Sequence, residues 1–367
     1  MRVAIVAPLV TAIAEPQAGG SQAFVSDLAR GLVRRGHDVD VYAAAGSRIP
    51  GVRVIDTGID PAALAATLFR AGARAGARAS AREEGSAAAD PGPARAAFGT
   101  VYAAVRSARY DVVHNHAFDV PAVELATGLG APVVHTLHLP PDAAMAAALS
   151  RASSGPAPLA VACVSQFQAG AWRAVTRVDA VLSPLVPTGV IGFRLAAGDG
   201  AVFAGRLSPE KGAAQAIDIA RAAGIAIEVY GDAYDAQYAR ERIAPRGAEP
   251  GVTVHPGVPR AALWPAMARA AVVLCPSQWD EPFGMAPAEA QACGTPVVAF
   301  RRGGLAEVII DGVTGFLIAP GDITAAAGAV RRAAALSRRA CRDHAVSDLD
   351  LERSLDAHEH LYQRLAG

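Results

Sequence analysis

The sequence predicts an α/β protein made of two doubly wound, Rossmann-like domains, each built on a parallel sheet. Three observations support this fold class. The chain has 367 residues, which is too many for one ordinary core. Short runs of Val, Ile and Ala without polar alternation recur along it, as in strands covered on both faces. Helix-sized segments separate these runs, as in βαβ units.

The expected strands form two series of five, one in each half of the chain. Those of the first half are residues 2–7, 38–44, 111–116, 132–137 and 159–164. Those of the second half are residues 200–205, 225–231, 251–256, 271–277 and 295–300. Two such series predict two sheets, with ligands bound at the carboxyl ends of the strands.

The domain boundary is expected in the Pro- and Gly-rich stretch 183–200. We therefore expect a first domain over 1–188 and a second, nucleotide-binding domain over 189–348. The remaining residues, 349–367, read as an amphipathic helix that could pack back on the first domain. Its apolar side is expected to carry Leu351, Leu355, His358 and Leu361 or Tyr362.

Composition excludes several classes of protein. Lys+Arg and Asp+Glu are both 34, so the balanced charge gives no indication of a nucleic-acid partner. The four cysteines are far apart and form no CxxC pair, which favours reduced thiols over disulfides or a zinc site. The apolar run at the N-terminus is too short to span a membrane and lacks a signal-peptide cleavage pattern. We expect a cytoplasmic protein.

The segment "EPFGMAPAEAQACGTPVVAF", residues 281–300, places two carboxylates eight positions apart around the start of a helix. Pro287 suits the first helical turn, and Gly284 and Met285 would offer backbone N–H groups to an anion. Glu281 and Glu289 would then serve as acceptors for paired sugar hydroxyls. The alternative is that both are carboxylates stabilised by the helix dipole alone.

A second segment, "VFAGRLSPEKG" at 202–212, carries Arg206 and Lys211 just past a strand. Two cations at that place can flank a diphosphate, although they could also belong to a surface turn. No GxGxxG follows a strand, so a dinucleotide site lacks its fingerprint. Gly19 and Gly20 form a short flexible loop ahead of a helix, which by itself is a weak signal.

One further pattern is a basic stripe made by four arginines spaced four residues apart. These are Arg70, Arg74, Arg78 and Arg82. On a helix they would form a slanted line of positive charge. A solvated helix face explains them, and so does a contact with an anionic acceptor or a membrane surface.

Four segments together carry a resemblance to a known family. They are "EPFGMAPAE" (281–289), "FAGRLSPEKG" (203–212), "RRGGLAEVIIDGVTGFLIAPGD" (301–322) and "GGSQAFVSDLARGLVRRGHDVDVYA" (19–43). The first resembles the E-x7-E motif of the family-four retaining glycosyltransferases, which have the GT-B fold. The resemblance implies an enzyme that moves a sugar from a nucleoside-diphosphate sugar to a hydroxyl acceptor. It covers most of the chain and is more specific in the second half.

By this resemblance, the donor nucleotide lies mostly on the second domain. Arg206 and Lys211 would neutralise the departing diphosphate, Glu281 would contact the transferred sugar, and Glu289 would hold the ribose. The remaining donor contacts are expected from Phe283, Gly284, Met285 and Ala286 at sugar and phosphate, from Tyr230, Gly231 and Val258 at the base, and from Gly19 and Gly20 at the phosphates.

The segment "DVVHNHAFD", residues 111–119, resembles the family's histidine segment in the first domain. We expect His116 next to the reacting centre and His138 in the same cleft, whereas His114 reads as a core histidine. Each could instead be a satisfied core residue. Thr188 stands where the family usually has asparagine, which puts the loop contacts there in doubt.

The resemblance also implies the mechanism. No carboxylate is obviously placed as a nucleophile, so front-face attack is expected, with the leaving phosphate helping to deprotonate the acceptor. The two cations can replace a metal, and we expect no required divalent ion and no cofactor. The acceptor could be a small molecule, a glycan or a lipid-linked sugar. The alternatives are a sugar-nucleotide epimerase of the same fold and a non-catalytic nucleotide-binding relative.

Overall fold

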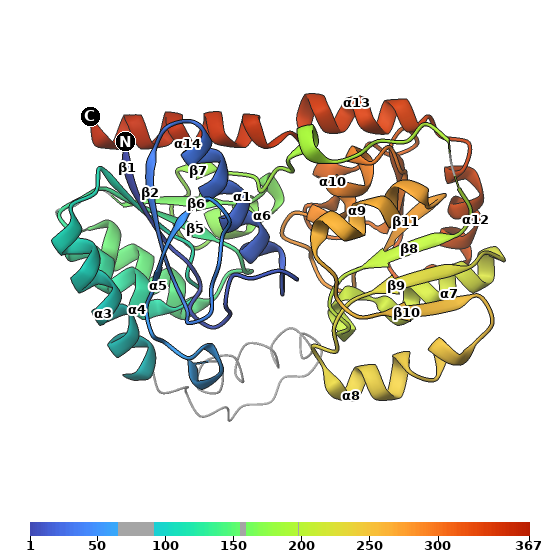
Figure 1. The fold of residues 1–367 in the computed structure, drawn as a ribbon, viewed down its shortest axis with the longest axis horizontal. Coiled ribbons are helices and arrows are strands. Elements are labelled where there is room, and N and C mark those ends of the chain that lie inside the picture. Colours follow the sequence, from blue (N-terminus) through green and yellow to red (C-terminus); the bar gives the residue numbers. More distant parts are fainter. Residues whose placement is uncertain (65–91, 155–158, 197) are drawn as a thin grey trace. The chain divides into compact units, whose positions relative to one another are not determined.

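The computed structural model describes residues 1–64, 92–154, 159–196 and 198–367 (Figure 1). The basic stripe of Arg70 to Arg82 lies outside these described residues. The chain divides into two compact units. The N-terminal unit comprises Met1–Ala14, Gly20–Pro184 and Ser354–Gly367, and the C-terminal unit comprises Glu15–Gly19 and Leu185–Arg353. Both chain termini therefore belong to the N-terminal unit.

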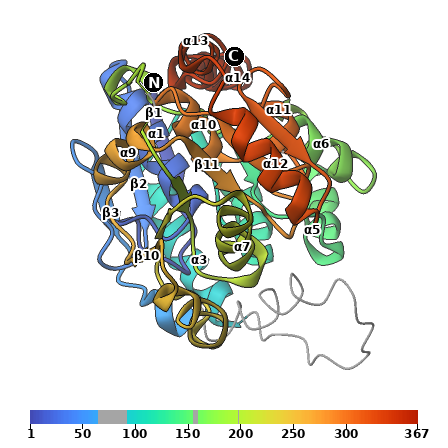
Figure 2. The ribbon, with the colours of Figure 1, turned by 90° about the vertical axis from the view of Figure 1, so that its right-hand side faces the viewer.

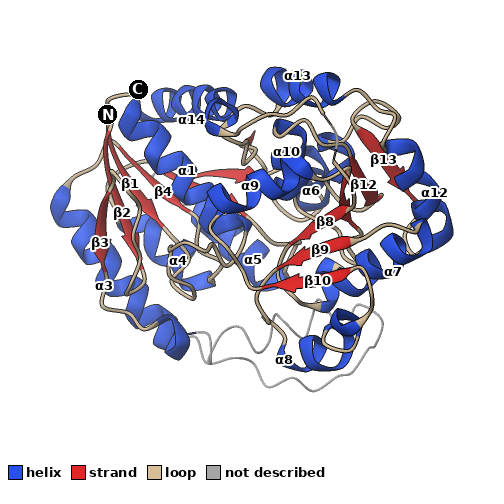
Figure 3. Ribbon diagram, turned by 45° about the vertical axis from the view of Figure 1, so that its right-hand side comes forward, coloured by secondary structure: helices blue, strands red, loops and turns tan. Residues whose placement is uncertain are grey.

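The N-terminal unit is built on a seven-stranded parallel sheet in the order β3-β2-β1-β4-β5-β6-β7. Its strands are β1 (Arg2–Val6), β2 (Asp38–Ala43), β3 (Arg53–Asp56), β4 (Val112–Asn115), β5 (Val133–Leu137), β6 (Leu159–Cys163) and β7 (Ala180–Val181). Figure 3 shows its strands flanked by helices. Because the order reverses at β1, the loops after β1 and β4 diverge at the carboxyl edge and leave room for a ligand.

The helices of this unit lie between its strands in the sequence. They are α1 (Gly20–Arg34), α3 (Gly92–Ala108), α4 (Val120–Glu124), α5 (Ala143–Ser153), α6 (Gln166–Arg173) and, from Ser354 on, α14 (Leu351–Ala366). The expected apolar side of the last helix is confirmed, since Leu355, His358 and Tyr362 are fully buried. The hydroxyl of Ser354 donates to the carbonyl of Ser183 at 2.6 Å.

The C-terminal unit is built on a six-stranded parallel sheet in the order β10-β9-β8-β11-β12-β13. Its strands are β8 (Ala201–Ala204), β9 (Ile227–Tyr230), β10 (Val252–His255), β11 (Val272–Cys275), β12 (Val297–Phe300) and β13 (Gly315–Ile318). Its helices are α7 (Ala213–Ala223), α8 (Ala236–Tyr238), α9 (Arg260–Arg269), α10 (Met285–Ala292), α11 (Leu305–Val308), α12 (Ile323–Ala333) and α13 (Arg338–Asp348). Helices α7 and α12 pack side by side (Figure 2).

All ten expected strands are present, and the prediction of two parallel sheets is confirmed. The sequence analysis missed β3, β7 and β13, which lie at sheet edges. The central strands β1, β4, β5, β6 and β12 are almost wholly buried, which is why their sequences are continuously apolar. An edge strand has one neighbour and one open side, so its sequence needs no such run.

Two further expectations can be compared with the described residues. All four cysteines are free, as expected. Over the described ranges, no helix combines the length and apolarity that a membrane crossing requires. Thr188, which stands where the family usually has asparagine, is buried in the C-terminal unit and donates to the Asp350 carboxylate, while its carbonyl accepts from Arg342 at 3.0 Å.

Candidate active site

The site in the C-terminal unit is formed where the loops after β8 and β11 meet. These strands are neighbours in a parallel sheet, so their carboxyl ends lie at the same edge. Gly212 ends the first loop with φ +78°, and a Cβ there would lie 2.1 Å from the carbonyl oxygen of Pro276. The backbone N–H of Gln278 donates to the carbonyl of Glu210 at 2.8 Å. Glycine at 212 therefore permits the close approach of two loops.

This approach brings Lys211 and Glu281 into direct contact. The Lys211 ammonium lies 2.7 Å from one carboxylate oxygen of Glu281 and 2.9 Å from the other. The two side chains are only 22% and 13% exposed, so water screens the pair weakly. The sequence analysis gave the two residues separate roles, and the structure shows that they form one ion pair.

Two further donors hold the Glu281 carboxylate. The indole N–H of Trp279 donates at 3.0 Å and the Ser277 hydroxyl at 3.2 Å. Burial alone would raise the pKa of Glu281, but the Lys211 charge and the hydrogen bonds from Lys211, Trp279 and Ser277 outweigh it and lower the pKa below its usual value. The carboxylate is therefore ionised at neutral pH. Sequence reasoning missed Trp279 and Ser277, since no spacing rule singles them out.

Arg206, in the same loop as Lys211, is less tightly held. Its guanidinium lies 3.3 Å from the Glu210 carboxylate and 4.4 Å from the centre of the Tyr234 ring. Its Nε atom is buried and has no hydrogen-bond partner among the described residues. A buried donor of this kind is unusual, and a ligand oxygen would satisfy it. Arg206 and Lys211 thus offer two cations from one strand end.

Helix α10 supplies the second carboxylate and a helix start. Gly284 precedes the helix with φ +117°, and a Cβ there would lie 2.6 Å from Leu305. Met285 and Ala286 open the helix, and their backbone N–H groups have no partner within it. Phe283, just before them, is buried. Glu289 lies one turn in, is 4% exposed, and accepts from the Arg260 guanidinium at 2.6 Å.

A glycine pair after β12 fixes the backbone of the Glu281 loop. The N–H of Gly304 donates to the carbonyl of Glu281 at 2.7 Å. Gly303 has φ +57°, and a Cβ there would lie 2.1 Å from the same carbonyl oxygen. The sequence by itself indicated no role for these two glycines. Their neighbour in space, Glu281, could not be inferred from their spacing.

The residues expected at the base lie at the carboxyl ends of β9 and β10. The Tyr230 ring is stacked on that of His255 with centroids 4.3 Å apart, and its hydroxyl donates to Glu228. Gly231 has a packing role, because a Cβ there would lie 2.0 Å from the Gly205 carbonyl oxygen. Val258 is half-buried in the loop that follows β10. Tyr230 thus lies at the end of β9, the strand next to β8 and the Arg206 loop, whereas Val258 follows β10, one strand further away.

In the N-terminal unit, five histidines form what we call the histidine cluster. His114, His116, His135 and His358 are buried, and His138 is half-buried. Both His116 and His138 follow strands, β4 and β5, and their Nδ1 and Nε2 atoms lie 3.0 Å apart. Burial, reinforced by the neighbouring histidines, lowers the pKa of His116 well below its usual value. His114 is a satisfied core residue, as its sequence position indicated.

The structure thus gathers the expected residues into two groups, one in each unit. The C-terminal group joins Arg206, Lys211, Glu281, Glu289 and the start of α10. The N-terminal group joins His116 and His138, with Gly20 at the start of α1, whereas Gly19 falls with the C-terminal unit. In the described residues, no group of three or more His, Cys, Asp or Glu side chains could hold a metal ion.

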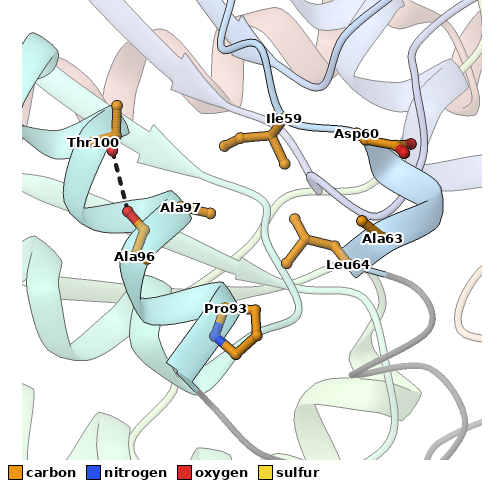
Figure 4. Close-up of a pocket in the computed structure, with 8 residues that line it drawn as sticks. All are labelled: Ile59, Asp60, Ala63, Leu64, Pro93, Ala96, Ala97 and Thr100. Atoms are coloured by element: carbon orange, nitrogen blue, oxygen red, sulfur yellow. Dashed lines mark hydrogen bonds between the residues drawn. The ribbon is translucent and has the colours of Figure 1, made fainter.

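A depression of about 490 Å³ lies elsewhere in the N-terminal unit (Figure 4). It is lined by Ile59, Asp60, Ala63, Leu64, Pro93, Ala96, Ala97 and Thr100. Figure 4 shows apolar side chains on both of its walls, with the Asp60 carboxylate as the charged group. The described residues that line it include no cation, which does not suit a diphosphate, so this depression is separate from the candidate site.

Both halves of the chain match family models of glycosyltransferases. Residues 199–345 match the family model described as glycosyl transferases group 1, and residues 18–191 match that of glycosyltransferase family 4. A D-inositol 3-phosphate glycosyltransferase of Mycolicibacterium paratuberculosis is 31% identical over 94% of this chain and 86% of its own. The chain belongs to glycosyltransferase family 4.

Other relatives of this family-4 chain match over shorter stretches. A D-inositol 3-phosphate glycosyltransferase of an Arthrobacter strain is 50% identical over 78 residues, and the match spans 18% of that relative's length. Another, of Kribbella flavida, is 56% identical over 50 residues, which is 12% of its length. Such matches show strong local similarity. They do not show that this chain has the same substrates as those relatives.

Solved structures show the fold of the family-4 chain. AviGT4, a glycosyltransferase involved in avilamycin A biosynthesis, is 23% identical over all of this chain and 98% of its own, with a TM-score of 0.68. Anabaena HepE in complex with UDP-glucose is 20% identical over 99% of this chain and all of its own, with a TM-score of 0.73. The two parallel-sheet units are those of a GT-B glycosyltransferase, as the resemblance implied.

Proposed function

We propose that this glycosyltransferase moves a sugar from a nucleoside-diphosphate sugar to a hydroxyl acceptor with retention of the anomeric configuration. The observation that carries the proposal is the Lys211–Glu281 ion pair, 2.7 Å long, where two strand-end loops meet. It sets a cation and a hydroxyl-binding carboxylate side by side. A sugar joined to a diphosphate presents both kinds of partner, phosphate oxygens for the cation and hydroxyls for the carboxylate.

Leaving-group stabilisation is assigned to Arg206 and Lys211. When the bond between the anomeric carbon and the phosphate oxygen breaks, negative charge accumulates on the diphosphate and the sugar becomes oxocarbenium-like. Fixed cations and N–H groups aimed at that charge lower the barrier, because they need no reorganisation during the reaction. The unsatisfied Nε of Arg206 and the N–H groups of Met285 and Ala286 support this role.

The two carboxylates are assigned to hydroxyl groups of the donor. Glu281 is held ionised by Lys211, Trp279 and Ser277, so it can accept from the transferred sugar. Glu289 is oriented by Arg260 and would accept from the ribose. Tyr230, Gly231 and Val258 would border the base, while Phe283 and Gly284 line the sugar and phosphates, and Gly19 and Gly20 approach the phosphates.

Attack from the front face completes the reaction. The acceptor oxygen forms the new bond to the anomeric carbon on the side from which the diphosphate leaves. The leaving phosphate oxygen takes the acceptor's proton, so the products are the glycoside and the protonated nucleoside diphosphate. His116, with His138 beside it, is placed next to the reacting centre in this scheme. No divalent ion is required, because the two cations neutralise the leaving group.

The substrates are proposed by class. HepE structures contain UDP, glucose and UDP-glucose, so uridine diphosphate is the first donor nucleotide to test. Relatives named for D-inositol 3-phosphate make a polyol phosphate the first acceptor, before free sugars and lipid-linked sugars. Four free cysteines suit a reducing compartment, and we propose that the reaction occurs in the cytoplasm.

Lys211 allows a direct test, because it is the only lysine in the sequence. An amine-selective acylating reagent can modify only Lys211 and the Met1 amine, and mass spectrometry separates the two. UDP, GDP, ADP and TDP would be compared for slowing the modification of Lys211 and for raising the melting temperature. We expect one of them to protect Lys211 on the order of 10-fold or more while Met1 reacts normally, since a bound diphosphate occupies the ammonium.

Transfer is then measured with the sugar form of that nucleotide. A glycoside whose anomeric configuration matches the donor supports the proposal, and turnover should survive EDTA. An altered nucleotide sugar formed without any acceptor would identify an epimerase instead. If no nucleotide protects Lys211, or if the acylated enzyme keeps full turnover, the assignment of Lys211 to the diphosphate is wrong.

A further inference from the structure

Polar side chains form a ladder on one face of β4 and β5 and the residues that follow them. Successive same-face residues of a strand are two apart, so His114 and His116 share a face, as do Thr136 and His138. His114 contacts Thr136, and His116 contacts His138. The first pair lies within the sheet, and the second lies at its carboxyl edge, where ligands bind.

The first pair, His114 and Thr136, supports the ring of His116 from within the sheet. Nδ1 of His114 lies 2.6 Å from the Tyr362 hydroxyl and Nε2 lies 2.7 Å from the Thr136 hydroxyl, so both ring nitrogens are satisfied. Its ring lies 4.1 Å from that of His116, tilted by 33°. The Phe24 ring of α1 also packs against His116, perpendicular to it, with centroids 5.3 Å apart. His116 is therefore held in one orientation.

The second pair leaves one nitrogen without a partner. Nδ1 of His116 meets Nε2 of His138, while Nε2 of His116 is buried and has no hydrogen-bond partner among the described residues. The pKa of each ring is lowered, that of His116 by full burial and that of His138 by partial burial, so both rings are neutral. Each then carries one N–H, and a single proton lies between them. The ring that supplies this proton decides whether Nε2 of His116 is a donor or an acceptor.

Burial favours one of these two arrangements. Were the proton on His138, His116 would carry a buried N–H with no acceptor among the described residues. Among backbone groups, buried donors without a partner are rarer than under-used acceptors, and we apply the same preference to this ring. With the proton on Nδ1 of His116, His138 carries its own on Nδ1, on a side chain that is partly exposed and can reach water. The second arrangement leaves a bare nitrogen lone pair at Nε2 of His116.

We propose that His138 is a positioning residue that holds His116 in the Nδ1–H tautomer, so that its bare Nε2 accepts a hydrogen bond from a substrate hydroxyl. This inference rests on the proposed transfer reaction, and it moves His138 from touching substrate to acting through His116. His114, Tyr362 and Phe24 fix the ring that His138 orients.

The test compares three variants of the full-length protein. His138→Leu removes the acceptor, whereas His138→Gln can return an amide oxygen to the position of Nε2. His135→Leu is the matched control, because His135 is a buried histidine of the same strand whose ring nitrogens have no hydrogen-bond partner among the described residues. Circular dichroism and melting temperature show which variants fold.

The first readout does not depend on activity. In protein labelled with ¹⁵N-histidine, a bare and a protonated ring nitrogen resonate far apart, and His116→Gln assigns the His116 signals. We expect Nε2 of His116 to be bare in the wild type, in His138→Gln and in His135→Leu, and to change in His138→Leu. A protonated Nε2 in the wild type would overturn the proposal, whether or not the protein transfers sugar.

The second readout is kinetic. We expect His138→Leu to lower kcat on the order of 100-fold, because a misplaced contact at the reacting centre has effects of that size, while KM for the donor stays within about 3-fold. His138→Gln should recover most of the rate and His135→Leu should keep it. Equal kcat in wild type and His138→Leu would also overturn the proposal. A wild type that binds no nucleotide would instead count against the proposed function.

Discussion

Replacing Lys211 by methionine is expected to destabilise the C-terminal unit by an amount that grows with pH. Methionine keeps the bulk of the aliphatic stem but removes the charge that Glu281 faces at 2.7 Å. A buried carboxylate left without its cation must either stay charged at high cost or bind a proton. Trp279 and Ser277 still donate to it, which favours its present position.

Protonation limits the penalty, and this limit can be calculated. Holding Glu281 neutral costs about 1.36 kcal/mol for each pH unit above its unfolded pKa of 4.5. The pH-dependent part of the loss is therefore at most about 4 kcal/mol at pH 7.5 and about 1.4 kcal/mol at pH 5.5, and the lost ion pair adds an amount that is constant over this window. In the wild type the pKa of Glu281 is lowered, so its contribution is complete above pH 4.5 and constant over this window. In the variant the folded pKa is raised, and stability falls as pH rises.

Urea denaturation at pH 5.5, 6.5 and 7.5 measures this difference directly. The double variant Lys211→Met/Glu281→Gln is the matched control, because a neutral amide removes the unpaired charge and can still accept from Trp279. We expect it to recover the stability to within about 1 kcal/mol at every pH, since an ion pair replaced as a whole costs little. Turnover should stay about 100-fold below the wild type, because the leaving-group cation is absent.

A loss of stability that is the same at all three pH values would refute this reasoning. It would mean that Glu281 keeps its charge without Lys211, through water or a shift of its loop. The histidine cluster also titrates in this window, but it is present in both proteins and cancels in the difference.

The remaining predictions concern the glycine loop, the first cation and acid stability. Gly303→Ala should lower turnover at least 10-fold by displacing the Glu281 carbonyl, whereas Gly312→Ala, at a similar positive φ of +77° but with open space around it, should cost only about 1 kcal/mol and leave turnover near normal. Arg206→Ala should lower turnover on the order of 100-fold and Arg221→Ala, on the exposed face of α7, should not; equal rates would contradict the leaving-group role. The histidine cluster should make the N-terminal unit unfold first on acidification. Burial lowers the pKa of His135 and His358 to about 4, so both are neutral in the folded protein and bind protons more readily when it unfolds. The free energy of unfolding is therefore highest above pH 6.5 and falls by about 2 kcal/mol per histidine by pH 5. Hydrogen exchange at pH 7 and pH 5 would show this as lost protection in β4 and β5 before β8 and β11, and simultaneous loss would count against it.

Local sequence determined the elements and the residue types at the strand ends. Continuous apolar runs are needed only where a strand is covered on both faces, so the central strands were all found. Of the four edge strands of the two described sheets, β10 was found and β3, β7 and β13 were not. Helix α10 was recognisable from the sequence because Gly284, Pro287 and Gly294 influence only the backbone a few residues away, where they mark its start and its end. The same is true of the buried side of α14, which follows from its period.

Tertiary structure decided which of these residues meet. Lys211 and Glu281 are 70 positions apart in the chain and become partners because β8 and β11 are neighbours in the sheet. Strand order is not encoded in any single segment, so neither this pair nor the contact between Gly303 and Glu281 could be inferred from spacing. The same holds for the side chains that orient His116. Phe24, which packs against it, comes from α1, and Tyr362, which contacts His114 beneath it, comes from α14. The sequence by itself determined the elements and the chemistry each could offer, because hydrophobic period and turn propensity act locally. Only the packed sheets could decide which charges and ring nitrogens face one another, because those contacts join segments that are distant in sequence.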